Sequence, residues 1–312
     1  MAILKVFIAD DFHHSLMNGL EAKKIAFSYQ PTASKQKITE AFQGEFNVLI
    51  IRSKIEVDTQ FLEQTTSLKY IGRGGAGLDN LDLKACKLKG IECFNAGEAN
   101  SQAVAEHTLG MLLSLIRNIS SSYQELKNSI WLREENRGVE LSNLIIGVIG
   151  FGNTGSAFAR TISGLGSKVL AYDKYKSGFG SKGILETSLK ELVAAADVIS
   201  LHIPLTSETN KWVDSKFINE CKDAFILLNM SRGGIVCLSS VMDGLHKCKI
   251  GGFGADVWEN ENFQTFTPEQ VSTFELATSK NNVILTPHIA GWTVESYKKI
   301  SEVLLRKIIK CV

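Results

Sequence analysis

The sequence lacks the features that mark membrane, secreted and nucleic-acid-binding proteins. It has no run of about 18 apolar residues, and its N-terminus, MAILKVFIAD, has too short an apolar stretch for a signal peptide. Its 34 Lys and Arg residues nearly balance 33 Asp and Glu, so the formal net charge is +1 and no basic footprint for nucleic acid is present. We therefore expect a cytoplasmic protein with a small-molecule partner, and no nucleic-acid or membrane partner.

The cysteines form no metal-binding or redox motif. The six cysteines are scattered, without a CxxC pair or a metal-ligand spacing to histidine. They are expected to be reduced structural thiols in a reducing compartment, and no metal site is predicted. The chain also has only four prolines and no Pro-rich linker or internal repeat, so composition does not mark a domain boundary.

What the sequence does contain is typical of an α/β protein. With 312 residues, 44% of them apolar, it can form two ordinary domains with sizeable cores. Short apolar runs alternate with segments of helical period, which indicates parallel sheets covered by helices on both faces. The predicted strands are Ile3–Ala9, Val48–Ile51, Leu68–Gly72, Ile145–Ile149, Lys168–Tyr172, Val198–Leu201, Phe225–Leu228, Phe253–Val257 and Val283–Leu285.

Two segments predict long helices. Ser101–Ile119 has a broad apolar face, and apolar residues also spill around its sides. We expect this helix to be buried between domains or subunits and to lie at the centre of a homodimer. Thr293–Ile309 is amphipathic, with Thr293 as its candidate N-cap.

A glycine-rich turn follows the strand in NLIIGVIGFGNTG. Gly150, Gly152 and Gly155 have GxGxxG spacing, and each has a separate task. The first permits a tight turn, the second lets backbone approach a pyrophosphate, and the third allows close helix packing. The helix after this turn is predicted to offer its N-terminus to the phosphates, with Asn153 and Thr154 in the binding turn.

Asp173 ends the second strand of this strand-turn-helix-strand unit, about 20 residues after the first glycine. A carboxylate there accepts hydrogen bonds from ribose hydroxyls and repels a 2′-phosphate, which favours NAD over NADP. Asp173 could instead merely end the strand, although the complete βαβ frame argues against that interpretation. Lys174 and Lys176 lie next to it and leave the cofactor choice open.

Further motifs resemble the family of D-isomer-specific 2-hydroxyacid dehydrogenases, from about Arg52 to Thr293 and in the family's order and spacing. They are GRGGAGLDNLD (72–82), AVAEHT (103–108), HIPLTSET (202–209), NMSRGGIV (229–236), ADVWENE (255–261) and TPHIAGWT (286–293). The resemblance implies hydride transfer between NAD(H) and C2 of a small D-2-hydroxy acid.

The resemblance also implies site residues. Gly75 and Ala76 would bind the substrate carboxylate through backbone N–H groups, and the residues placed against the cofactor would be His202, Pro204, Met230 and Asp256. The catalytic residues would be Arg232, Glu261 and His288.

Each catalytic side chain suits a step of the chemistry. Arg232 can hold a carboxylate with two donors, and His288 can give or take a proton near neutral pH. Glu261 can fix the tautomer of His288 and favour its imidazolium form. Taken singly, Arg232 could cap a helix and His288 could be an ordinary loop histidine, but their joint occurrence favours a catalytic set.

The sequence departs from the family at three positions. Asn262 stands where proline is usual, Cys237 where an acidic or amide residue is usual, and Trp292 where a small residue is usual. No reacting group is lost, so the departures bear on the shape of the pocket and on the substrate.

The segment IIRSKIEVD (50–58) bears on the substrate's tail. Arg52, Ser53 and Lys54 directly follow a buried strand, and the segment resembles the phosphate-binding loop of phosphoglycerate dehydrogenases. Together they could hold a dianion, which would make 3-phosphoglycerate the substrate. Alternatively these residues are solvated at a strand end, and the enzyme reduces glyoxylate or hydroxypyruvate.

The implied architecture is two doubly wound parallel-sheet domains, with a Rossmann-type dinucleotide domain (99–286) inserted in a flavodoxin-like substrate domain (1–98 plus 287–312). The site is expected at the cleft between them. A non-catalytic NAD-sensing co-repressor has the same fold and polar residues, so fold alone does not exclude it. Formate or phosphite oxidation uses the same frame, but the Glu261–His288 pair argues against formate.

Overall fold

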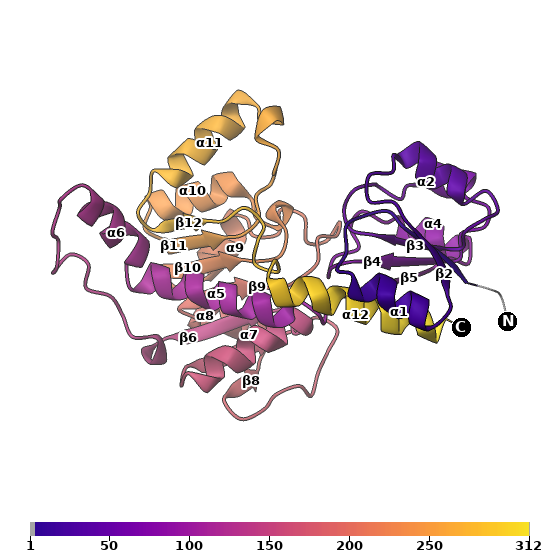
Figure 1. Cartoon of the computed structure of the whole chain (residues 1–312). Helices are drawn as coiled ribbons and strands as arrows, with labels where there is room; N and C mark the ends of the chain where they lie inside the picture. Colours follow the sequence, from indigo (N-terminus) through magenta and orange to yellow (C-terminus); the bar gives the residue numbers. More distant parts are fainter. Residues whose placement is uncertain (1–3, 312) are drawn as a thin grey trace. The chain divides into compact units, whose positions relative to one another are not determined.

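The chain folds into two α/β units, each built on its own parallel sheet. The computed structural model describes residues 4–311, so Ile3, the first residue of one predicted strand, lies outside the described residues. Unit 1 comprises residues 4–100 and 292–311, and unit 2 comprises residues 101–291 (Figure 1). The observed boundaries follow Asn100 and Gly291, whereas the sequence analysis placed them after residues 98 and 286.

Unit 1 contains a five-stranded sheet in the order β2-β1-β3-β4-β5, with all neighbouring strands parallel. This is the flavodoxin-like order that was predicted. The strands are β1 (Lys5–Ile8), β2 (Ala26–Tyr29), β3 (Val48–Ile51), β4 (Tyr70–Arg73) and β5 (Glu92–Asn95). The helices are α1 (Ser15–Ala22), α2 (Lys35–Ala41), α3 (Thr59–Gln64), α4 (Leu83–Leu88) and α12 (Val294–Lys310).

Helices cover both faces of the unit 1 sheet. Side chains of α2, α3 and α4 share one buried cluster with Phe7, Leu49 and Ile71 of the strands. Side chains of α1 and α12 share the opposite cluster with Ile8 and Ile50. Helix α12 begins as predicted, because the Thr293 hydroxyl accepts a hydrogen bond from the Ser296 backbone N–H. The C-terminal helix therefore completes the core that the N-terminal strands begin.

Unit 2 contains a seven-stranded parallel sheet in the order β12-β11-β10-β9-β6-β7-β8, the doubly wound order of dinucleotide-binding domains. Its strands are β6 (Ile145–Ile149), β7 (Lys168–Tyr172), β8 (Ile184–Glu186), β9 (Val198–Leu201), β10 (Phe225–Asn229), β11 (Ile250–Ala255) and β12 (Val283–Leu285). Its α-helices are α5 (Ser101–Ile116), α6 (Ile119–Lys127), α7 (Asn153–Gly164), α8 (Leu189–Ala195), α9 (Ser215–Glu220), α10 (Leu238–His246) and α11 (Pro268–Thr278).

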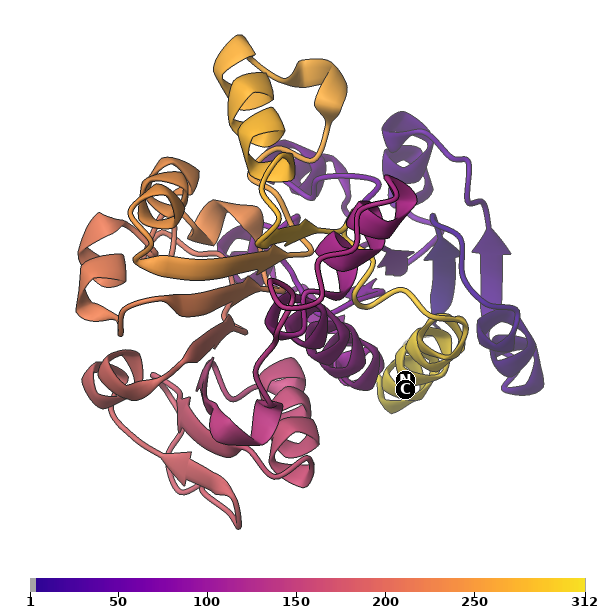
Figure 2. The ribbon, with the colours of Figure 1, turned by 90° about the vertical axis from the view of Figure 1, so that its left-hand side faces the viewer.

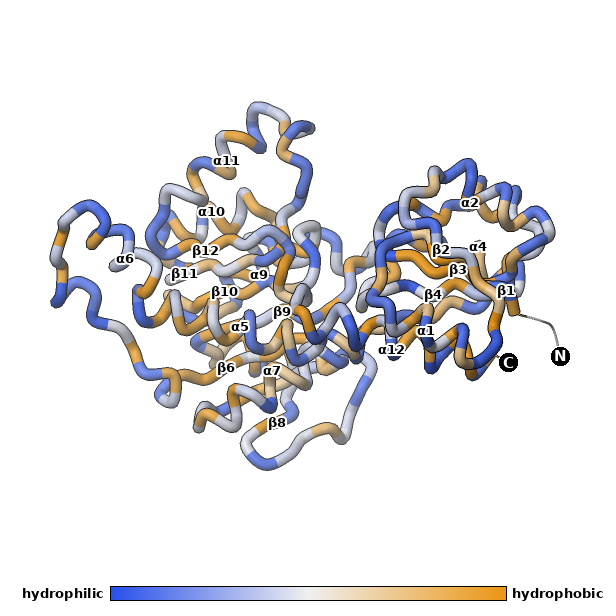
Figure 3. Tube along the Cα trace, in the orientation of Figure 1, coloured by the Kyte–Doolittle hydropathy of each residue, from blue (hydrophilic) through white to orange (hydrophobic). Residues whose placement is uncertain are grey.

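The helices of unit 2 also form two layers. Residues of α5 and α7 pack together on one face of the sheet, and residues of α8, α9 and α10 pack on the other. Figure 2 shows these layers on opposite sides of the strands, and Figure 3 shows the strands as mostly hydrophobic segments. Within residues 4–311, every helix is too short or too polar to cross a membrane.

The sequence analysis missed three strands, extended one helix too far and missed the helix that follows it. Strands β2, β5 and β8 each lie at a sheet edge, where only part of each strand is buried, so none forms a continuous apolar run. The predicted helix Ser101–Ile119 ends at Ile116, and α6 starts anew at Ile119. Asn118 breaks the helix by adopting a left-handed conformation with φ of 52°.

Candidate active site

The glycine turn after β6 has the geometry that a dinucleotide requires. Gly150 has φ of +95°, and a Cβ at Gly155 would lie 1.9 Å from the Gly150 carbonyl oxygen, so both positions require glycine. A Cβ at Gly152 would meet nothing within 4 Å, which leaves open space beside the first turn of α7. This space and the N–H groups of that turn fit a pyrophosphate.

Asp173 is tied to the glycine turn by hydrogen bonds. Its Oδ2 accepts from the Phe151 backbone N–H at 2.7 Å, and its Oδ1 accepts from the backbone N–H groups of Tyr175 at 2.9 Å and Lys176 at 3.1 Å. These bonds fix the carboxylate at the end of β7. A carboxylate has about four lone-pair sites, so this one can still accept from ribose hydroxyls.

The two lysines beside Asp173 have partners within the protein. The ammonium group of Lys174 pairs with Glu208, which raises the pKa of Lys174 through that hydrogen bond. The ammonium group of Lys176 donates to the Phe151 carbonyl at 3.1 Å. Neither lysine is left without a partner to attract a 2′-phosphate, so the surroundings of Asp173 fit NAD.

His202 lies in the interior of unit 2. Its Nε2 is 2.9 Å from the Ser200 hydroxyl, and its ring packs on Phe158 with the ring centroids 5.5 Å apart. Burial lowers the pKa of His202 to about 3, so its imidazole is neutral. Its carbonyl lies against Gly150. Pro204 is exposed and Met230 is half-buried, and cofactor contacts of all three residues stay a prediction.

Asp256 organises the loop that carries His288. Its carboxylate is buried and accepts from the backbone N–H groups of Ile289 at 2.8 Å and Ala290 at 2.7 Å, and from the Thr286 hydroxyl at 2.6 Å. The His288 N–H donates to the Asp256 carbonyl at 2.7 Å. These bonds explain why His288 belongs to unit 2. A contact of Asp256 with the cofactor stays a prediction.

His288 and Glu261 form the predicted pair. The Nδ1 of His288 lies 2.9 Å from Oε2 of Glu261, and each side chain is 46% exposed. His288 has φ of 57°, a left-handed conformation that is strained for a residue with a side chain. Burial alone would raise the pKa of Glu261, but the hydrogen bond and charge of His288, with the charge of Arg232, lower it below its usual value.

Arg232 follows β10, and its backbone is held near the same pair. The Asn229 side chain donates to the Arg232 carbonyl at 2.9 Å, and the Arg232 Nη1 donates to the Ser231 carbonyl at 2.7 Å. The guanidinium charge acts on Glu261. Unit 2 therefore brings together a cation, a carboxylate and an imidazole, as the sequence predicted.

The predicted carboxylate loop of unit 1 follows β4. Gly75 has φ of 153°, and its N–H donates to the Arg73 carbonyl at 3.0 Å. The loop is held by β5, because Ala96 N–H donates to the Gly75 carbonyl and the Asn95 side chain to the Ala76 carbonyl. Ala76 is exposed, and no acceptor among residues 4–311 takes its N–H, so that donor is open to a ligand.

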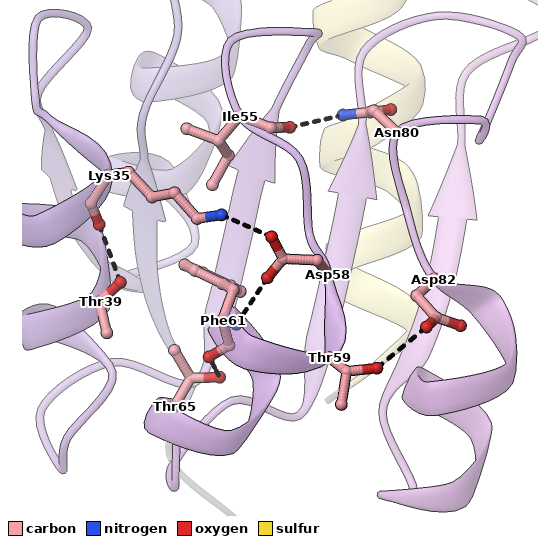
Figure 4. Close-up of polar contacts among 9 residues, drawn as sticks. All are labelled: Lys35, Thr39, Ile55, Asp58, Thr59, Phe61, Thr65, Asn80 and Asp82. Carbon is pink, nitrogen blue, oxygen red and sulfur yellow. Dashed lines mark hydrogen bonds and ion pairs between the residues drawn. The ribbon is translucent and has the colours of Figure 1, made fainter.

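Arg52, Ser53 and Lys54 follow β3 in unit 1, but their side chains differ in their partners. The Lys54 ammonium donates to the Ala9 carbonyl at 3.2 Å and to the Pro31 carbonyl. Ser53 is exposed, and the Arg52 guanidinium lies over aromatic rings. The Asn80 side chain holds the segment by donating to the carbonyls of Arg52 at 3.1 Å and Ile55 at 3.0 Å, and Figure 4 shows the bond to Ile55.

Sequence reasoning missed two features of these sites. His107 was not among the predicted site residues, but its Nε2 lies 3.0 Å from the Thr286 hydroxyl that also binds Asp256. Trp292 was noted only as a departure, although its ring lies against Arg52. No local motif marks either contact, since the partners are far apart in sequence. Within residues 4–311, no group of three or more His, Cys, Asp or Glu side chains could hold a metal ion.

Comparisons with known proteins agree with this geometry. Residues 109–290 match the family described as D-isomer specific 2-hydroxyacid dehydrogenase, NAD binding domain. The chain is 34% identical over 266 residues to a hydroxypyruvate reductase from Thermotoga maritima, covering 85% of each protein. It is 32% identical over 314 residues to a D-3-phosphoglycerate dehydrogenase from Methanocaldococcus jannaschii, covering 99% of this chain but only 57% of that protein.

A solved structure of a related dehydrogenase has the same fold as this chain. The chain superposes on a D-lactate dehydrogenase from Aquifex aeolicus, solved with NAD and lactic acid, with a TM-score of 0.84. The sequence identity is 30%, and the match covers 98% of this chain and 94% of the other. The predicted family, fold class and NAD cofactor are thereby confirmed. This chain belongs to the D-isomer specific 2-hydroxyacid dehydrogenase family and is an NAD-dependent oxidoreductase.

Proposed function

We propose that this enzyme uses NADH to reduce C2 of a small, unphosphorylated 2-keto acid, with hydroxypyruvate as its preferred substrate. NADH supplies the hydride when it is bound. Arg232 holds the substrate carboxylate with its planar donors and polarises the neighbouring carbonyl. The backbone N–H of Ala76 supplies a further donor for the carboxylate, as the resemblance of the Gly75 loop implies.

His288 delivers the proton to the carbonyl oxygen in this proposal. Glu261 occupies Nδ1 of the ring, so Nε2 is the atom left to face the substrate. The Glu261 carboxylate stabilises the protonated ring before transfer, since an opposite charge nearby favours imidazolium. During oxidation of the 2-hydroxy acid, the same Nε2 takes the proton back.

The surroundings of Arg52 carry the choice of an unphosphorylated substrate. The Lys54 ammonium donates to two backbone carbonyls, so Arg52 is the remaining cation of the predicted phosphate loop. The carboxylates of Asp10 and Asp11 both act on the Arg52 charge. One cation beside two carboxylates offers no net positive charge to a phosphate dianion. The similarity to a hydroxypyruvate reductase over 85% of each chain supports the same choice.

The similarity to a D-3-phosphoglycerate dehydrogenase makes 3-phosphoglycerate the second candidate substrate. The deciding measurement is kcat/KM for hydroxypyruvate, glyoxylate and phosphohydroxypyruvate with NADH, repeated for 3-phosphoglycerate with NAD. We expect hydroxypyruvate to exceed its phosphorylated analogue. A clear advantage for the phosphorylated substrates would overturn the proposal. Binding of NADH without turnover of any 2-keto acid would favour a non-catalytic NAD sensor.

The cofactor-binding residues form part of the proposal. The pyrophosphate would lie against Gly152 and the N–H groups of Asn153 and Thr154, and the ribose hydroxyls would bind Asp173. The remaining predicted contacts, from His202, Pro204, Met230 and Asp256, would lie along the rest of the cofactor. The imidazole of His202 is buried, so its contact would come from its backbone.

We also propose a homodimer, with α6 and the segment after it at the interface. The sequence analysis centred the dimer on the helix from Ser101, but six residues of α5 are already buried within the chain. Large exposed apolar side chains follow instead in Ile119, Tyr123, Leu126, Ile130, Trp131, Leu132 and Val139. A patch of this kind marks an interaction site, and a second copy supplies a matching apolar surface.

Light scattering tests the dimer. We expect a mass of about twice 34.3 kDa for the wild type and of one chain for Tyr123→Glu/Trp131→Glu. Leu276→Glu, on exposed α11, is the control and should stay dimeric. A monomeric wild type would contradict the proposal.

We also propose a cytoplasmic location, because all six cysteines are free.

A further inference from the structure

Arg52 sits in an aromatic cage within unit 1, formed by Phe12, Trp292 and Tyr297. Its Cζ lies 4.2 Å from the Trp292 ring centroid, 5.7 Å from that of Phe12 and 5.6 Å from that of Tyr297. A cation over an aromatic face is attracted by the ring's electrons, most strongly for tryptophan. The shortest contact is therefore also the strongest one, and it comes from Trp292, one of the three residues at which this sequence departs from its family.

The guanidinium lies over these three rings and keeps its hydrogen-bond donors. Among residues 4–311, no acceptor takes a hydrogen bond from the Arg52 side chain, whose N–H groups lie in the plane of the guanidinium. Burial lowers the pKa of Arg52, while the charges of Tyr297, Asp10 and Asp11 oppose that effect. A partly desolvated cation with unused donors favours a ligand that offers an oxygen acceptor.

The cage itself is braced. Tyr297 and Tyr29 each donate a hydrogen bond to the Asp11 carboxylate, at 2.8 and 2.7 Å, and these two bonds lower the pKa of Asp11. Trp292 packs edge-on against Tyr297, with ring centroids 5.8 Å apart. The Arg52 backbone N–H donates to Asp10 at 2.6 Å. The position and direction of the Arg52 side chain are thus set before any ligand arrives.

We infer that Trp292 is a positioning residue that holds the Arg52 guanidinium so that its N–H edge binds the hydroxyl oxygen on C3 of the substrate. The inference rests on the proposed function and identifies the C3 hydroxyl as the substrate group for which the site is specific. A neutral hydroxyl needs one well-placed donor and no surplus positive charge, which matches one arginine beside two aspartates. Trp292 would act through Arg52 and touch no reacting atom.

Hydroxypyruvate and pyruvate test this inference because they differ only in that hydroxyl. A hydrogen bond to a charged group is worth about 10- to 100-fold in kcat/KM, so we expect the wild type to prefer hydroxypyruvate by that factor. Trp292→Leu, which keeps bulk but removes the ring, should reduce the preference to about 3-fold or less, through KM and not kcat. Trp292→Phe should retain most of it.

Two comparisons separate positioning from a general defect. Leu88→Ala removes an exposed side chain elsewhere in unit 1 and should keep the wild-type preference. Arg52→Met should lose the preference, and adding Trp292→Leu to it should change nothing more, because both changes remove one interaction. Equal losses for hydroxypyruvate and pyruvate in Trp292→Leu, or additive effects in the double variant, would overturn the inference.

A binding measurement separates this inference from the proposed function. Calorimetry on the enzyme–NADH complex compares D-glycerate with D-lactate, which again differ only in the C3 hydroxyl. If the wild type reduces no 2-keto acid, the proposed function fails. The inference then stands only if the wild type binds D-glycerate more tightly than D-lactate and Trp292→Leu loses this difference. If turnover is present but the hydroxyl preference survives in Trp292→Leu, the inference alone fails.

Discussion

The two units share one architecture but hold their polar side chains in different ways. In unit 2, hydrogen bonds join the polar groups to one another. Asp256 accepts from backbone N–H groups of the loop that carries His288, and Glu261 is hydrogen-bonded to the His288 ring. In unit 1, aromatic rings surround the Arg52 guanidinium, and its donors stay unused among residues 4–311. Hydrogen bonds fix the tautomer of a proton-transfer group, whereas stacking fixes a cation while leaving its edge for a ligand.

The largest effect should come from the hydrogen-bonded site of unit 2. His288→Ala removes the proposed proton donor, and general acid–base catalysis contributes about 10²- to 10⁴-fold. We expect kcat to fall by that factor while NADH binding, measured by fluorescence titration, stays close to the wild-type value. His246→Ala, an exposed histidine of the same unit, should keep full activity. Near-normal turnover of His288→Ala would remove this residue from the mechanism.

A substitution of Asp173 tests whether a hydrogen-bonded carboxylate of unit 2 also distinguishes NADH from NADPH. Asp173→Ala loses the bonds proposed for the ribose hydroxyls, each worth about 1.5–3 kcal/mol when one partner is charged. The ratio of kcat/KM for NADH to that for NADPH should therefore fall about 10- to 100-fold. A wild-type preference for NADPH, or an unchanged ratio in the variant, would argue against this role.

Asp256 tests how far the loop of His288 depends on its buried acceptor. Asp256→Asn replaces one acceptor oxygen with an NH₂ group, so either the part-buried Ile289 N–H or the buried Ala290 N–H loses its partner. A buried unsatisfied group costs about 1–3 kcal/mol, and we expect the free energy of unfolding in urea to fall by that amount. Asp243→Asn, half-exposed on α10, is the control. Unchanged stability would mean that the loop does not need this carboxylate.

Glu261 should give the smallest effect, seen in the pH profile. Glu261→Gln removes the charge that favours protonated His288, so the basic limb of the profile for reduction should move to lower pH. The Glu261 pKa is lowered in the folded state, so its contribution to stability is present above the ordinary glutamate value and lost as pH falls through the lowered one. Glu275→Gln, exposed on α11, should leave the basic limb in place; a shift there too would weaken the assignment.

The sequence by itself determined the central strands, the glycine turn and the order of the proposed catalytic residues. Central parallel strands are apolar on both faces, so β3, β6 and β9 are visible as continuous runs. Gly150 and Gly155 can be predicted from the local sequence, because the turn permits no side chain at either position. Arg232, Glu261 and His288 were found through motifs that contain them.

Only the tertiary structure decided the edge strands of the two sheets and the surroundings of Arg52 and Lys54. Strands β2, β5 and β8 exist because they pair with a neighbour, and an edge strand needs no apolar run. The sequence places Lys54 two residues after Arg52, but packing sends its ammonium to the Ala9 and Pro31 carbonyls. Trp292 meets Arg52 across most of the chain's length. Such contacts depend on which distant segments the fold brings together, and local patterns do not record them.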